Sequence, residues 1–69
     1  MITDIGIVAG EIWHQLDQKG EMLLSELVTR INRERDVVLM SVGWLAREGH
    51  VVLERHNEGS EYTIRLRNK

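Results

Sequence analysis

Arginine side chains gather in a polar stretch near the middle of the chain. Arg30, Arg33 and Arg35 lie within six residues, and Arg47 follows further along. Guanidinium groups in such a cluster can neutralise nucleic-acid phosphates, and this neutralisation supplies most of the affinity of non-specific binding. Acidic residues alternate with the arginines, so the same pattern is also typical of a solvated turn. We expect no more than weak nucleic-acid binding at these four residues.

A second set of residues could bind a protein surface. Val37, Met40 and Trp44 recur at the spacing of one helix face, with Ser41 beside them and Ile7 of an earlier segment at the edge. A helix that reads base edges carries Arg, Lys, Asn or Gln, whereas aromatic residues and methionine are typical of interface cores. The alternative is that Trp44 packs on its own chain. We favour the interface, with a second copy or with a partner protein.

Two glycines interrupt the first helical pattern. Gly6 and Gly10 lie four residues apart, on the flank away from its apolar stripe. Glycine inside a helix costs about 1 kcal/mol relative to alanine. The pair indicates either the close approach of another backbone or simple tolerance near the start of a helix, and the sequence favours neither reading.

Residues for catalysis or metal binding do not form a recognisable pattern. The chain has no cysteine, no glycine-rich phosphate loop and no serine in an activating context. Its histidines are scattered without ligand spacing; they are His14, His50 and His56. We therefore expect no enzyme activity, no cofactor and no metal. The net charge of −2 also disfavours a dedicated DNA-binding protein.

The length of 69 residues predicts one domain spanning residues 1–69. A domain this small buries only about 60% of the surface of its unfolded chain, and such domains often rely on disulfides, metals or oligomerisation. Without cysteine or a metal pattern, a homodimer becomes the expected support. No cationic leader and no run of membrane-spanning length is visible. We expect a soluble cytoplasmic protein that does not associate with membranes.

The elements that would position these residues follow from hydrophobic periodicity. A first helix is expected from a cap at Thr3 or Asp4 to a stop at Gly20, followed by a short extended segment at 21–23. A second helix over 24–31 and a polar turn at 32–35 lead to a third helix, capped by Asp36 and stopped by Gly49. Residues 51–56 and 62–67 then alternate as two strands of a hairpin.

The predicted core combines one stripe from each element. In the hairpin, a four-residue loop would pair Leu53 with Ile64, and Arg65 would lie diagonal to Glu54. The first and second helices contribute Ile5, Val8, Ala9, Ile12, Leu16, Leu24, Leu27, Val28 and Ile31; the third contributes Val38, Val42 and Leu45, and the hairpin pairs Val51 with Leu66.

Three helices followed by a hairpin, with a tight polar turn between the second and third helices, is the order of a winged helix-turn-helix. The run GWLAREGHV at residues 43–51 resembles the junction between the last helix and the first wing strand in many bacterial and archaeal winged helix domains. Over about residues 4–66 the chain is similar to small stand-alone winged helix-turn-helix proteins of unknown function. The resemblance implies an α+β fold.

The same resemblance implies a DNA-binding, regulator-like protein, with the third helix in the major groove and the hairpin tip on the phosphate backbone. Other domains with this fold only mediate protein contacts, which is the alternative function. Glu58 and Glu61 flank Gly59 at the predicted tip, with only Arg55 and His56 nearby. An acidic tip disfavours phosphate contact, so the residues themselves favour the alternative.

Overall fold

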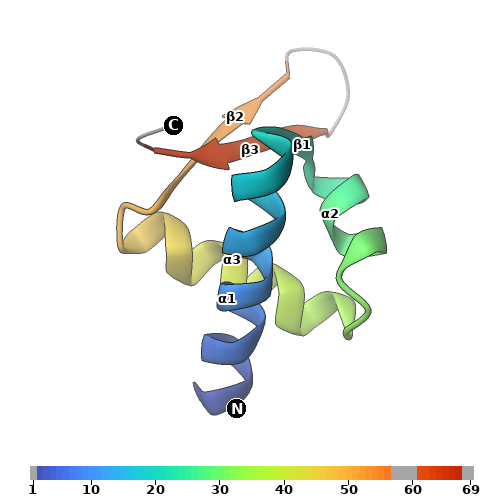
Figure 1. Cartoon of the computed structure of the whole chain (residues 1–69), viewed down its shortest axis with the longest axis vertical. Coiled ribbons are helices and arrows are strands. Elements are labelled where there is room, and N and C mark those ends of the chain that lie inside the picture. Colours follow the sequence, from blue (N-terminus) through green and yellow to red (C-terminus); the bar gives the residue numbers. More distant parts are fainter. Residues whose placement is uncertain (1, 57–60, 68–69) are drawn as a thin grey trace.

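Helices occupy the first two thirds of the chain, and a small sheet closes one end. The computed structural model describes residues 2–56 and 61–67, with the backbone alone at residue 2. The elements follow the predicted order: α1 (Ile2–Lys19), β1 (Glu21–Leu23), α2 (Leu24–Arg30), α3 (Arg35–Arg47), β2 (Val51–Arg55) and β3 (Tyr62–Leu66). α3 crosses α1, while α2 packs against β1, β3 and α3 (Figure 1).

The sheet is antiparallel and has the strand order β1-β3-β2. The predicted hairpin register is confirmed, since Leu53 lies opposite Ile64 and Val51 opposite Leu66. The short extended segment before α2 is confirmed as an edge strand that pairs with β3. Arg65 Nε lies 3.7 Å from Glu54 Oε1, which confirms the diagonal pair. The predicted turn at 57–60 lies outside the described residues.

One hydrophobic core joins the helices to the sheet, and the predicted stripes supply nearly all of it. Leu24 and Val28 are only partly buried at its edge. Leu53 departs further from the predicted core, because its side chain remains 39% exposed. The core comprises Val8, Ala9, Ile12, Leu16, Met22, Leu27, Ile31, Val38, Val42, Leu45, Val51, Ile64 and Leu66.

Glycine ends the first and third helices. Gly20 has φ +86° and its amide donates to the Leu16 carbonyl at 2.7 Å, so it ends α1 as predicted. Gly49 has φ +80°. Its amide donates to Ala46, and the following amide, of His50, donates to Leu45. These two bonds form a Schellman motif, which ends α3 and redirects the chain into β2.

The predicted helix starts are late by two or three residues. α1 begins at Ile2, before the expected caps Thr3 and Asp4. α3 begins at Arg35, because the Val38 amide bonds the Glu34 carbonyl and closes the first turn two residues earlier than a cap at Asp36 would. Glu34 is the N-cap residue and makes no side-chain cap bond. Asp36 therefore lies inside the first turn, where its charge still favours the positive end of the helix dipole.

Candidate interaction face of helices α1 and α3

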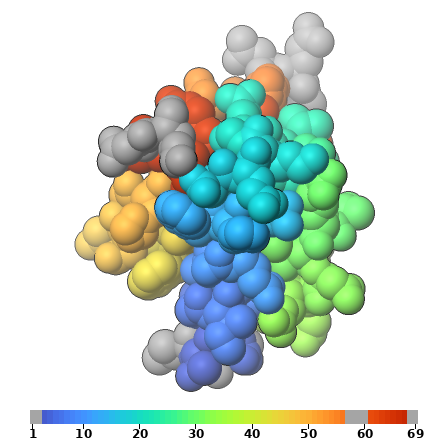
Figure 2. Space-filling model, in the orientation of Figure 1, coloured from blue at the N-terminus to red at the C-terminus, as the bar shows by residue number. Residues whose placement is uncertain are grey.

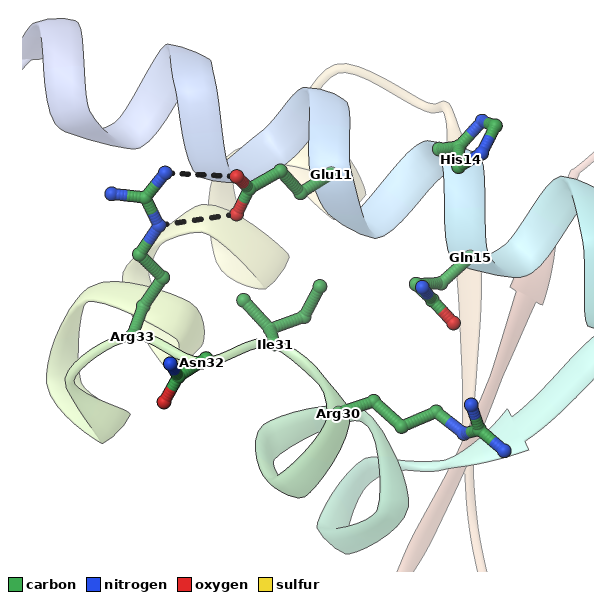
Figure 3. Close-up of a pocket in the computed structure, with 7 residues that line it drawn as sticks. All are labelled: Glu11, His14, Gln15, Arg30, Ile31, Asn32 and Arg33. Carbon is green, nitrogen blue, oxygen red and sulfur yellow. Dashed lines mark hydrogen bonds and ion pairs between the residues drawn. The ribbon is translucent and has the colours of Figure 1, made fainter.

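Arg33 is held by an acidic residue of α1. Its Nε and Nη2 donate to the two carboxylate oxygens of Glu11 at 3.2 and 2.8 Å (Figure 3). This hydrogen bonding lowers the pKa of Glu11 and raises that of Arg33. The pair fastens the turn before α3 to α1. A guanidinium that already binds a carboxylate in two places is a poor ligand for phosphate.

Arg30 and Arg33 do not converge on a common ligand. Both line an open depression of about 430 Å³ between α1 and the turn after α2. In Figure 3 the Arg30 side chain extends away from Arg33. Arg30 instead lies 3.9 Å from a carboxylate oxygen of Glu26, one turn earlier in α2. The arginine cluster predicted from the sequence is therefore divided between two acidic partners.

The remaining arginines of the predicted patch lie at opposite ends of α3. Arg35 and Arg47 are both exposed, and no ion pair joins either to a described residue. Twelve residues of helix separate them by about 18 Å. Asp36 and Glu48 lie next to them and balance their charge. α3 contains no asparagine or glutamine and therefore lacks the amide side chains that commonly read adenine.

Charged residues at both ends of β3 make internal contacts. The Glu61 carboxylate accepts bonds from the Ser25 hydroxyl at 2.9 Å and the Ser25 amide at 3.4 Å. These bonds lower the pKa of Glu61 and tie the start of β3 to α2. Arg67 Nε donates to the Gly49 carbonyl at 2.9 Å. Glu61 thus points to α2, whereas the predicted tip residues Glu58 and Gly59 lie outside the described residues.

The predicted apolar face is only partly exposed. Met40 and Trp44 are 42% and 47% exposed, and Ile7 of α1 is 50% exposed. Val37 is partly buried and packs against the core. Ser41 requires a correction: it is fully buried, its hydroxyl donating to the Val37 carbonyl at 2.7 Å with the Ile5 carbonyl at 3.3 Å. It joins α3 to α1 and is not part of the exposed face.

A hollow of about 260 Å³ lies between α1 and α3, and we call it the tryptophan groove. It is lined by Gly6, Ala9, Gly10, Trp13, Trp44, Leu45 and His50. The ring centroids of Trp44 and His50 are 6.4 Å apart. In Figure 2 the C-terminal half of α3, in yellow, lies alongside α1, in blue. The sequence patterns do not pair Trp13 or His50 with Trp44, because only the crossing of α1 and α3 brings them together.

Two other kinds of site are absent from residues 2–56 and 61–67. No group of three or more histidine and acidic side chains there could hold a metal ion. None of the helices in this part of the chain is long and apolar enough to cross a membrane.

Known proteins with similar sequences and structures share this architecture. Residues 1–65 match a family described as the winged helix-turn-helix domain DUF2582. The uncharacterized protein MJ1608 of Methanocaldococcus jannaschii is 33% identical over 66 residues, covering 91% of this chain and 90% of that protein. The solution NMR structure of BT2368 from Bacteroides thetaiotaomicron is similar, with a TM-score of 0.76 and 36% identity, covering 93% of this chain and 76% of that one. The predicted fold is thereby confirmed.

Proposed function

This chain belongs to the winged helix-turn-helix domain family DUF2582, and we propose that it acts within that fold as a protein-contact module. The exposed side of α3, extended by α1, docks on a protein surface. One observation carries the proposal: Met40 and Trp44 are half exposed on the helix that would otherwise enter a DNA groove. An apolar patch on so small a surface is typical of an interaction site.

The polar groups around this face support the same proposal. A winged helix that reads DNA needs basic or amide side chains along its third helix. Here Arg35 and Arg47 are far apart and balanced by acidic neighbours, while Arg33 binds Glu11. A helix of this composition gains more from burying its apolar side chains than from approaching phosphate.

A photo-crosslinking experiment tests the proposal. We would place a photo-reactive p-benzoylphenylalanine at Met40 of the full chain and irradiate cells that make it at native level. The expected product is an adduct that protease degrades and nuclease does not. The matched control carries the same group at Thr29, which is exposed on α2 and should give no adduct. A nuclease-sensitive adduct at Met40 would overturn the proposal.

Weak, non-specific DNA binding is a second candidate function. The fold favours it, because many winged helix domains bind DNA. Arg35 and Arg47 favour it too, since both are exposed and make no ion pair with the described residues. Such binding would rest on phosphate contacts alone and would carry no sequence preference.

A further inference from the structure

We infer that a second copy of this chain is the partner that docks on the exposed face of α1 and α3. The contact is a two-fold homodimer in which Ile7, Gly10, Trp13, Met40 and Trp44 of each copy meet the same residues of the other. The inference rests on the proposed function and names its partner.

The helical glycines provide the first argument. A Cβ atom built on Gly6 or Gly10 would meet nothing within 4 Å. Neither residue has a positive φ, so the backbone does not require glycine either. Each glycine nevertheless costs about 1 kcal/mol relative to alanine in a helix. Nothing within the described chain uses the space above them, whereas a second backbone approaching α1 closely would.

The distribution of charge on the face provides the second argument. None of the five contact residues ionises, and polar residues surround them on the same two helices. His14 lies one turn after Gly10, and Arg47 lies one turn after Trp44. An uncharged centre with a polar rim is the usual anatomy of a protein interface. Because the centre is uncharged, two copies can meet there without like-charge repulsion.

The exposed area is on the scale that a small dimer needs. Ile7, Trp13, Met40 and Trp44 are between 42% and 50% exposed. Large side chains exposed to this degree present roughly 100 Å² each, or about 400 Å² together. A standard interface buries about 800 Å² per partner, and the glycine backbones and the rim would supply the remainder. A domain of 69 residues gains comparatively much from burying this area.

The face is also complementary to itself. It contains a hollow, the tryptophan groove lined by Gly6 and Gly10, and exposed apolar side chains on the same two helices. A two-fold axis places the same patch on both sides of the contact. The apolar side chains of one copy can therefore enter the groove of the other, and one sequence satisfies both sides.

Sedimentation equilibrium with glycine variants tests the dimer. The test variant is Gly6→Gln with Gly10→Gln, and the matched control is Gly43→Gln. Gly43 is also an exposed helical glycine with open space where a Cβ atom would lie, but it does not line the groove. We expect wild type and control to form dimers above about 100 µM. The double variant should raise the dissociation constant at least tenfold and keep its helical circular dichroism.

Two results would overturn the dimer. A wild type that stays monomeric at several hundred micromolar removes the second copy but leaves the proposed protein contact standing, since a Met40 adduct with a foreign protein remains detectable. A double variant that dimerises as tightly as wild type places the contact elsewhere. If the double variant does not fold, isotope-filtered NMR on mixed labelled and unlabelled wild type decides. Contacts between copies must then involve Trp13 or Trp44, and contacts confined to other residues contradict the inference.

Discussion

Glu11 and Arg33, 22 residues apart in the chain, form a two-pronged ion pair that joins α1 to the turn before α3. Arg33 belongs to the arginine cluster that the sequence pattern offers for phosphate binding. In the structure its side chain instead holds the turn before α3 to α1.

The first prediction concerns the pH dependence of this pair. The pKa of Glu11 is lowered in the folded state from its ordinary value of 4.5, so the pair adds stability above that value and loses it as the pH falls through the lower folded pKa. Glu11→Gln should lower the melting temperature at pH 7 by no more than about 4 °C, because the pair is exposed to solvent. At pH 3 the difference should shrink. A difference that grows on acidification would contradict the assignment.

The second prediction concerns DNA. Any binding to a mixed-sequence duplex should weaken steeply with salt, and Arg35→Ala and Arg47→Ala should each reduce the salt slope by about one. Arg33→Ala should reduce it less, since Glu11 already binds that guanidinium. Glu11→Gln should strengthen binding by releasing Arg33. Fluorescence titrations at several salt concentrations measure all four variants. No binding at high micromolar protein in low salt would remove DNA as a ligand.

The third prediction concerns the core. Leu45 is buried beneath the tryptophan groove. Leu45→Ala should cost about 2–5 kcal/mol through lost burial and a residual cavity, which would unfold much of the population of so small a domain. Met40→Ala is the matched control on the same helix and should cost the monomer less than about 1 kcal/mol. Urea denaturation measures both. A loss below about 0.5 kcal/mol for Leu45→Ala would show that the wrong face of α3 has been assigned to the core.

The fourth prediction concerns the contact between the hairpin and α2. The Ser25 hydroxyl is the main cause of the lowered pKa of Glu61. Ser25→Ala should therefore move the pKa of Glu61 upward, towards its ordinary value, in an NMR titration of the side-chain carboxyl. Thr29→Ala is the matched control, because Thr29 lies on the same helix and its hydroxyl bonds the Ser25 carbonyl instead of Glu61. An unchanged Glu61 titration in Ser25→Ala would show that the contact is absent in solution.

Local patterns in the sequence account for nearly all of the fold. Periods of 3.6 and 2 residues located the helices and strands, and the glycine stops at Gly20 and Gly49 are confirmed by their positive φ angles. The helix starts could not be placed as well. Asp36 has a side chain able to cap α3, yet Glu34 occupies the N-cap position with no side-chain bond.

The candidate site depends on contacts between elements, which periodicity does not contain. Ser41 falls at the edge of the apolar spacing of α3, and only the position of α1 shows that its hydroxyl points inward to the Ile5 carbonyl. Nothing local in the sequence links Arg33 to Glu11 or places Trp13 opposite Trp44. Helical spacing within α3 could indicate that Met40 and Trp44 lie away from its core stripe, and both side chains are half exposed.

The last prediction separates an interface from a peripheral core. Trp44→Glu combined with Met40→Lys places opposite charges on two side chains that are both nearly half exposed. The folded monomer should tolerate them, at a cost of about 1 kcal/mol per residue, so the helical circular dichroism should persist. A contact that buries the same residues against another protein would instead remove both charges from water, at a cost that their mutual attraction need not repay, and should be lost. Sedimentation and circular dichroism on one sample distinguish these outcomes. Dissociation with the fold retained supports the interface, whereas unfolding would show that Trp44 is held mainly by its own chain.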